Sequence, residues 1–350
     1  MESIKKLVRE NILQLKPYQS ARSIYKQEGS CLMDANENPY GEYGRYPDSS
    51  QDKLKSKLAE LKSLSRDRVF LGNGSDEIID LLIRIFCVPS KDSIICLKPG
   101  FGMYAVCARI NDVNCVSLNL NEKYDLNQTI VDQCLDSEAK ILFLCSPNNP
   151  TGNALDEYYV NKLIDSFKGI VVIDEAYVDF NQRTTSFINR LGNNPRLVVL
   201  QTFSKGMGMA GLRIGALYGH KYIIQLLNKV KPPYNISSAN QRLALEILQN
   251  PKKLKDDIQK ILKERERLQK FFDEKYADIE TVPSDSNFIL FKCEDSDSVY
   301  QQLREAGIII RNQSYQIPNA LRISIGQPEE NQLFMKTFKK IYNAESIVSR

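Results

Sequence analysis

The sequence predicts an α/β fold in which a large domain with a mostly parallel sheet carries a smaller α+β domain. Between about residues 69 and 219, short apolar runs rich in β-branched residues alternate with longer helix-like segments, which is the pattern of parallel strands joined by crossover helices. At 350 residues, the chain also exceeds the length at which one hydrophobic core usually stops growing. We therefore expect two domains, with the doubly wound sheet in the first.

Six segments of the first region are predicted strands, at 69–71, 94–98, 141–145, 170–174, 197–202 and 214–218. The segment IIDLLIRIF has apolar residues on nearly every face, so it predicts a buried helix. A charged stretch from residue 252 to 276 repeats its apolar residues at helical spacing, and predicts a helix that links the two domains. The segments FILFK, GIIIR and LRISIG predict strands beyond it. The predicted division is an N-terminal arm (1–30), a large domain (31–245) and a small domain (246–350).

Composition excludes several classes of function. Lysine plus arginine number 47 against 43 acidic residues, and the resulting net charge of +4 is too small for an electrostatic nucleic-acid binder. No apolar stretch approaches the roughly 18 residues of a membrane span, and one histidine, His220, excludes a His-rich metal site. The eight cysteines form no Cys-x-x-Cys pair and the N-terminus lacks a signal-peptide core, which predicts reduced, mostly structural thiols in a cytoplasmic protein. We expect small-molecule chemistry without a metal.

The first chemical motif is LGNGSDEIIDLL, in which a strand ends at a glycine-rich turn and a helix begins. The backbone N–H groups of Ser75 and Asp76, together with the positive end of the helix, predict a phosphate site. The spacing matches neither the dinucleotide fingerprint nor the Walker loop. A plain turn followed by a Ser/Asp cap is the alternative.

The second motif is CSPNNPTG, residues 145–152, which follows a predicted buried strand. Its prolines stiffen a loop at the carboxyl end of that strand, where ligands of open α/β sheets bind. We expect a functional loop in which Asn149 presents its side-chain amide to the ligand. A plain turn is the alternative.

The third motif is IVVIDEAYVDF, in which an apolar strand runs into Asp174 and Glu175 and is followed by Tyr177. A carboxylate at the mouth of a buried strand is poorly solvated and needs a partner: a ligand cation, a metal ion or an arginine. A protonated pyridine nitrogen would meet that need. The structural alternative is that Asp174 only caps the next helix.

The fourth motif is LQTFSKGMGMAGLRIG, again a strand followed by a loop. Lys205 lies at the strand end among small residues, where desolvation and neighbouring cations would lower its pKa and free the amine for Schiff-base chemistry. Ser204 and Arg213 would supply phosphate ligands. A solvated surface lysine is the alternative.

The order of these four motifs resembles that of the fold-type-I pyridoxal-phosphate aminotransferases, whose large domain has a seven-stranded, mostly parallel sheet. The resemblance implies that pyridoxal 5'-phosphate is bound as a Schiff base on Lys205, that Asp174 pairs with the pyridine nitrogen, and that Lys205 moves the proton between the substrate and the cofactor. It also implies that Tyr177 and Asn149 contact the ring oxygen. The phosphate would be held by Thr202, Ser204, Arg213 and the backbone of Ser75 and Asp76.

Within that family, the chain is similar over essentially all of its length to the histidinol-phosphate aminotransferase branch. The segments that carry this likeness are LKPYQSAR, LMDANENPYG, RYPD, KPPYNIS, GIIIR and LRISIG. The likeness implies amino transfer between L-histidinol phosphate and 2-oxoglutarate, in a homodimer with shared active sites. Tyr46 would reach the cofactor phosphate of the partner subunit. The substrate pocket would include Tyr18, Asn149, Arg311 and Arg322.

The segment Pro99-Gly100-Phe101 departs from the Pro-Thr-Tyr usual in the family. The ring that stacks on the cofactor is then predicted to be Phe101, which lacks a hydroxyl, and offset stacking needs only the π face. Any hydrogen bond of the missing hydroxyl is lost. Tyr104, one helical turn later, could be mistaken for its replacement.

Three other functions stay open at this point. The first is an aminotransferase for aromatic amino acids, and the second is a pyridoxal-phosphate decarboxylase of a phosphorylated amino acid. The third is a binding or regulatory protein on a catalytically silent copy of the fold. That third possibility predicts loss of Lys205, Asp174 or Arg213, and all three residues are present.

Overall fold

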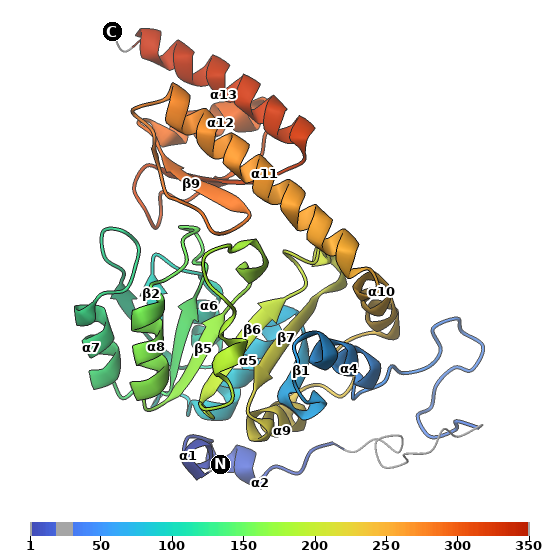
Figure 1. The fold of residues 1–350 in the computed structure, drawn as a ribbon. Coiled ribbons are helices and arrows are strands. Elements are labelled where there is room, and N and C mark those ends of the chain that lie inside the picture. The colour runs from blue at the N-terminus through green and yellow to red at the C-terminus, as the bar shows by residue number, and fades with distance from the viewer. Residues whose placement is uncertain (1, 19–30, 349–350) are drawn as a thin grey trace.

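A computed structural model describes residues 2–18 and 31–348, and its centre is a seven-stranded sheet (Figure 1). The strand order is β1-β7-β6-β5-β4-β2-β3, and β7 alone runs antiparallel to its neighbours within this sheet. The predicted fold class is confirmed. The bounds are β1 Val69–Asn73, β2 Ser93–Lys98, β3 Asn114–Asn119, β4 Ile141–Cys145, β5 Ile170–Asp174, β6 Leu197–Thr202 and β7 Ile214–Gly219.

The strand β3 was not among the six that the sequence predicted. Its sequence NCVSLN mixes polar and apolar residues, and no residue of the strand is fully buried. It lies at the edge of the sheet and pairs only with β2. An edge strand covers less of the core, so its apolar pattern is weak.

Helices cover both faces of the large sheet, because successive residues of each strand point to opposite sides. In β4, Leu142 and Leu144 join the core under α4, α7, α8 and α10, whereas Ile141 and Phe143 join the core under α1, α2, α5, α6 and α9. The helix bounds are α1 Glu2–Lys5, α2 Glu10–Gln14, α4 Asp52–Leu61, α5 Gly74–Phe86, α6 Met103–Ile110, α7 Gln128–Asp136, α8 Glu157–Ser166, α9 Lys221–Val230 and α10 Ser238–Leu248. Short 3-10 turns occupy Arg66–Arg68, Val178–Phe180, Phe187–Arg190 and Ala210–Leu212.

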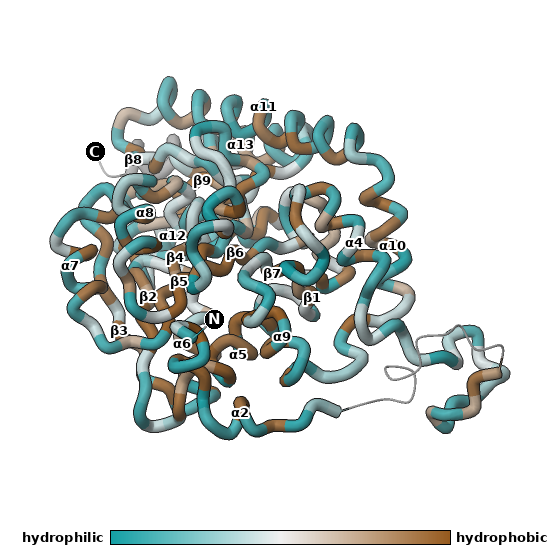
Figure 2. The backbone as a smooth tube through the Cα atoms, turned by 60° about the horizontal axis from the view of Figure 1, so that its bottom comes forward, coloured by the Kyte–Doolittle hydropathy of each residue, from teal (hydrophilic) through white to brown (hydrophobic). Residues whose placement is uncertain are grey.

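The helix predicted from IIDLLIRIF is α5, and it is buried as expected. Figure 2 shows this helix and α9 as largely hydrophobic segments, whereas α11 is mostly hydrophilic with hydrophobic stripes. The helix predicted between residues 252 and 276 is also confirmed, as α11 Pro251–Lys275. It begins after Asn250, whose side chain accepts a hydrogen bond from the Lys253 amide, and proline occupies its first turn.

The C-terminal part is a four-stranded antiparallel sheet, in the order β10-β11-β9-β8, packed against α11, α12 and α13 (Figure 1). An aromatic core that includes Phe272, Phe291 and Phe338 fills the space between them. The bounds are β8 Glu280–Thr281, β9 Phe288–Lys292, α12 Ser296–Glu305, β10 Arg311–Asn312, β11 Ala320–Ser324 and α13 Pro328–Val348.

The strand predicted over GIIIR is wrong except at Arg311. Gly307 ends α12 with a φ of 80°, and the following isoleucines connect this helix end to β10. The predicted division at residue 245 falls within α10, and the division into domains stays a prediction. Part of the predicted arm, residue 1 and residues 19–30, lies outside the described residues, as do four residues of LKPYQSAR.

In the part of the chain that the structure describes, no helix combines the length and the apolar character needed to cross a membrane. Six of the eight cysteines are buried, as expected for small hydrophobic side chains, whereas Cys31 is exposed and Cys115 is partly exposed.

Candidate active site

A cavity of about 270 Å³ lies where the carboxyl ends of the central strands meet the first turn of α5 and the small sheet. The register places the last residues of β4 and β5 side by side, so the loops that follow them open into the same space. The four sequence motifs, far apart along the chain, all contribute to it. Its lining is Ser75, Asp76, Phe101, Cys145, Asn149, Asp174, Ala176, Tyr177, Thr202, Ser204, Lys205, Arg213 and Arg322.

Asp174 ends β5 with a buried carboxylate. Its Oδ2 accepts a hydrogen bond from the Tyr104 hydroxyl at 2.6 Å, and its Oδ1 accepts one from the Ala176 amide at 3.0 Å. Burial raises the pKa of this carboxyl to about 6, although the hydrogen bonds from Tyr104 and Ala176 oppose the increase. Near neutral pH, the site therefore presents a poorly solvated negative charge that a cation would stabilise.

Lys205 follows β6, and its Nζ lies 5.8 Å from the centre of the Tyr177 ring. Burial lowers the pKa of this amine, and the positive charges of Arg322 and Arg213 lower it further. Both effects increase the fraction of neutral amine at a given pH. The neutral amine is the form that attacks a carbonyl carbon.

The first turn of α5 and Arg213 form a cradle suited to a dianion. Arg213 has left-handed backbone angles, and its Nη1 donates to Ser204 Oγ at 3.4 Å while its Nη2 lies 3.5 Å from an Asp76 oxygen. Gly74 has a φ of +78°, and a Cβ there would lie 2.7 Å from Arg213 Nη2. Glycine therefore keeps the turn open beside the guanidinium.

The helix start differs in detail from the Ser/Asp cap considered as the alternative. α5 begins at Gly74 with Asn73 as its N-cap, and the Asn73 side chain makes no capping hydrogen bond. The first-turn N–H groups of a helix have no partners within that helix. The amides of Ser75 and Asp76 are thus placed to bind an anion with the positive end of α5.

Asn149, Tyr177 and Arg322 form a chain of contacts on another wall. Asn149 Nδ2 donates to the Tyr177 hydroxyl at 3.2 Å, and Arg322 Nη1 donates to Asn149 Oδ1. The Arg322 guanidinium also lies 5.0 Å from the ring centre of Phe288. Its buried Nε has no hydrogen-bond partner among the described residues, so Arg322 has a donor available for an anionic ligand.

Phe101 lines the cavity, and Tyr104 lies behind it, with their rings edge to face at 5.4 Å. Tyr104 is buried and stacks on Phe143 at 4.6 Å, so it does not take the place of the Phe101 ring. The sequence reasoning did not assign Tyr104 a role. Its spacing, one helical turn after Phe101 at the start of α6, was the available signal.

Three residues predicted for the site do not line this cavity. Tyr18 is 72% exposed and borders a different cavity, and Tyr46 stacks on Tyr234 with ring centres 4.4 Å apart. Arg311 is exposed on β10 directly opposite Arg322 on β11. Opposite residues of paired strands share a face, and the charge of Arg311 contributes to a lowered pKa of Arg322, whose main cause is burial. The roles of these three residues stay predictions.

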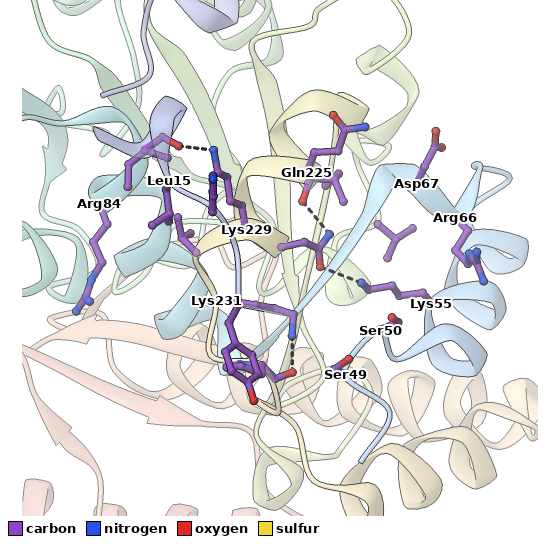
Figure 3. A pocket seen from close by; sticks show the side chains of 18 of the residues that line it. Leu15, Ser49, Ser50, Lys55, Arg66, Asp67, Arg84, Gln225, Lys229 and Lys231 are labelled. Atoms are coloured by element: carbon purple, nitrogen blue, oxygen red, sulfur yellow. Dashed lines mark hydrogen bonds between the residues drawn. The ribbon is translucent and has the colours of Figure 1, made fainter. Parts of the chain in front are cut away.

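A larger cavity, about 1020 Å³, lies between α2, α4 and α9 (Figure 3). It is rich in lysine and arginine, and burial together with the charge of Lys231 lowers the pKa of Lys55 to about 8. Three of its lysines already donate hydrogen bonds: Lys229 to the carbonyl groups of Ile12 and Leu13, Lys55 to Asn228, and Lys231 to Asn235. None of the four motifs reaches it, so the smaller cavity is the candidate active site.

Comparison with known proteins gives consistent matches. The family model "Aminotransferase class I and II" matches residues 25–338. A histidinol-phosphate aminotransferase of Parabacteroides distasonis is 45% identical over 344 residues, 97% of this chain and 99% of the relative. The chain belongs to the class I and II aminotransferase family.

Two solved structures share the fold of this aminotransferase at lower identity. Histidinol-phosphate aminotransferase from Sinorhizobium meliloti, in complex with pyridoxal-5'-phosphate, has a TM-score of 0.79 at 20% identity and covers 96% of this chain and 98% of that one. L-threonine-O-3-phosphate decarboxylase from Porphyromonas gingivalis has a TM-score of 0.73 at 22% identity, covering 86% and 91%. The fold thus carries more than one reaction, and the site residues must decide between them.

The lowered pKa of Lys205 is testable without any ligand. The rate at which acetic anhydride labels Lys205, followed by peptide mass spectrometry, should reach half of its maximum at a lower pH than for surface lysines of the same chain. Arg322→Ala removes a neighbouring positive charge and should move that midpoint to higher pH, whereas Arg66→Ala, which alters a residue of the larger cavity, should not. Identical profiles in all three proteins would contradict the electrostatic coupling.

Proposed function

We propose that this aminotransferase transfers the amino group reversibly between L-histidinol phosphate and 2-oxoglutarate, in histidine biosynthesis, with pyridoxal 5'-phosphate as its cofactor. The observation that carries the proposal is one cavity in which Lys205, Asp174 and Arg213 converge and which Arg322 helps to line. The 45% identity to a relative of that name over nearly the whole chain supports the substrate. A cytoplasmic location stays a prediction.

The cavity fits the cofactor in each of its parts. Lys205 would hold the aldehyde carbon, Asp174 the ring nitrogen, and the hydroxyl of Tyr177 with the amide of Asn149 the ring oxygen. Phe101 would stack on the ring. The phosphate would be held by Thr202, Ser204, Arg213 and the backbone of Ser75 and Asp76. When bound, the cofactor supplies an electron sink for the carbanion formed when the substrate Cα–H bond breaks.

The protein's own groups then orient that bond and move the proton. The buried charge of Asp174 favours the protonated pyridine nitrogen, by the attraction between opposite charges in a poorly solvated site. With the cofactor bound, Lys205 Nζ would act as the general base that accepts the proton from the substrate Cα, and as the acid that gives it back. Burial and the charges of Arg322 and Arg213 lower its pKa, which increases the fraction of neutral amine that can accept a proton.

The substrate pocket must accept a phosphate ester and a dicarboxylate in turn. Arginine suits both, since its planar fork binds either anion through two parallel hydrogen bonds. Arg322 extends from β11 into the cavity and would serve both substrates. Arg311, opposite it on β10, would contribute with Tyr18 mainly to the phosphate.

We also propose a homodimer in which Tyr46 of each subunit reaches the cofactor phosphate held by the partner. The segment that precedes and includes Tyr46 exposes large apolar side chains, among them Met33 at 89% and Tyr40 at 95%. Such exposure is costly in a monomer and supports an interface that covers it. The stack of Tyr46 on Tyr234 would present both rings together at that interface.

The assay that tests the function is amino transfer from histidinol phosphate to 2-oxoglutarate, followed as glutamate formation. The wild-type protein should be active, and Lys205→Ala should lose at least about 10⁴-fold in kcat because both the covalent link and the proton carrier are gone. Faster turnover of phenylalanine would favour an aromatic aminotransferase, and release of carbon dioxide from a phosphorylated amino acid would favour a decarboxylase. No turnover, with Lys205 unmodified by the cofactor after borohydride reduction, would leave only the silent binding protein.

The division of labour between the two arginines predicts unequal kinetic effects. Arg322→Ala should reduce kcat/KM for both histidinol phosphate and 2-oxoglutarate by about 10²-fold or more, since a buried charge-assisted pair is lost. Arg311→Ala should affect histidinol phosphate more than 2-oxoglutarate. Steady-state kinetics with each substrate varied in turn measures both ratios, and equal losses for both substrates in both variants would rule out this division.

The shared active site predicts complementation between two defective variants. Tyr46→Ala alone and Lys205→Ala alone should be weak or inactive. After unfolding and refolding as a mixture, about half of the dimers are hybrids, and each hybrid keeps one site with Lys205 and the partner's Tyr46 intact. About one quarter of the wild-type activity should return. An activity equal to the average of the two separate variants would exclude the sharing of Tyr46.

A further inference from the structure

We propose that Tyr104 is a positioning residue for Asp174: its hydroxyl holds the Oδ2 oxygen and so fixes the carboxylate in the orientation that faces the ring nitrogen of the cofactor. The inference rests on the proposed function, because it assigns a role to a residue that acts through Asp174. Tyr104 does not line the cavity and would not touch the cofactor.

Two hydrogen bonds hold the carboxylate of Asp174. Oδ1 is held by the amide of Ala176, two residues along the same chain, and Oδ2 is held by Tyr104 from α6, seventy positions away. The Ala176 bond alone is local to the turn after β5 and fixes only one oxygen. The Tyr104 bond, at 2.6 Å, defines the rotation of the carboxyl group about its Cβ–Cγ bond.

Tyr104 is itself rigidly placed. Its side chain is buried, its ring stacks on Phe143 of β4 with an interplanar angle of 13°, and Phe101 packs edge to face against it. Phe143 is fully buried in the core between the sheet and α6. The position of the hydroxyl is thus set by packing against the large sheet and not by a loop. A carboxylate that must be precisely oriented needs such a rigid hydrogen-bond partner.

Phe101, the aromatic ring of this segment that lines the cavity, has no hydroxyl. The segment from Pro99 to Tyr104 has one phenol, that of Tyr104. Its hydroxyl donates to Asp174, and Tyr104 does not line the cavity. Phe101 can supply only the π face, and Tyr104 supplies the one side-chain hydroxyl of this segment.

The hydroxyl also affects the charge of Asp174. Burial raises the pKa of that carboxyl to about 6, and the hydrogen bond from Tyr104 is the largest of the effects that oppose the increase. The charge of Lys205 also lowers the pKa, whereas that of Asp76 raises it. The titratable groups that face Asp174 from the surrounding elements are Asp76 of α5, Tyr104 of α6, Cys145 of β4, Tyr177 after β5 and Lys205 after β6.

The sign of the pH effect follows from these contributions. Asp174 pairs with the protonated ring nitrogen as a carboxylate, so cofactor affinity falls when the pH falls through the pKa of Asp174. Without the Tyr104 hydroxyl that pKa rises, and the loss of affinity then begins at higher pH.

The test compares Tyr104→Phe with Tyr218→Phe. Both changes remove one buried phenolic oxygen, but the hydroxyl of Tyr218 has no hydrogen-bond partner among the described residues, so Tyr218→Phe reports the cost of the deletion itself. The measurement is the dissociation constant of pyridoxal phosphate from the apo-enzyme, by fluorescence titration from pH 5 to 9. At pH 7, Tyr104→Phe should bind about tenfold more weakly, and its affinity should begin to fall at a pH about one unit higher.

A second readout reports on the ring nitrogen directly. With cofactor labelled with ¹⁵N at the ring, the nitrogen resonance of Tyr104→Phe should shift toward that of the unprotonated ring relative to both wild type and Tyr218→Phe. In turnover, Tyr104→Phe should reduce kcat more than it raises KM, since the substrate pocket is unchanged.

The outcomes separate the inference from the function on which it rests. Equal affinity profiles and equal ¹⁵N shifts in Tyr104→Phe and Tyr218→Phe would overturn the role of Tyr104. If Asp174→Asn also leaves the affinity and the nitrogen resonance unchanged, the assignment of Asp174 is wrong and the proposed site fails with it. A normal effect of Asp174→Asn with no effect of Tyr104→Phe overturns the inference alone.

Discussion

The carboxylate of Asp174, buried at the end of a fully buried strand, is the constraint that the rest of the site accommodates. A negative charge in that position is unstable without partners, and the protein gives it two hydrogen bonds while leaving space for a ligand cation. The strand register then places the loop with Asn149 beside it, and the loop with Lys205 follows the next strand. The arrangement of the cavity follows from where parallel strands end.

The site combines a carboxylate with several positive groups, and their mutual effects set the chemistry. Burial lowers the pKa of Lys205, and the charges of Arg322 and Arg213 lower it further, which increases the fraction of neutral amine. Arg213 also lies beside the first turn of α5 and Ser204. Arg322 belongs to the small sheet, whereas Asp174 and Lys205 belong to the large one. Any movement of the small sheet relative to the large one would therefore change both the cavity and the pKa of Lys205.

The sequence identified candidate site residues best where a charged residue type stands at the end of an apolar strand. Asp174 and Lys205 could be singled out because a charged group at the end of an apolar strand must be compensated, and Arg213 as a phosphate ligand in the same motif as Lys205. The structure places all three at one cavity. Tyr104 could not be assigned, since nothing in its local sequence shows that its hydroxyl faces Asp174, seventy residues away. The strand β3 was missed because an edge strand needs no continuous apolar run. The strand over GIIIR was wrongly predicted because Ile308 and Ile310 pack on the core from a connecting segment, while Ile309 is exposed.

The sequence by itself determined the alternation of strands and helices, the order of the four motifs and the identity of the groups that carry the chemistry, because these depend on local periodicity and on residue type. Only the tertiary structure decided which of those groups meet. It placed Arg322 at the cavity of Lys205, left Tyr18 and Tyr46 away from it within one chain, and placed Tyr104 under Asp174. Contacts between residues far apart in the chain depend on strand register and helix packing, which no short stretch of sequence contains.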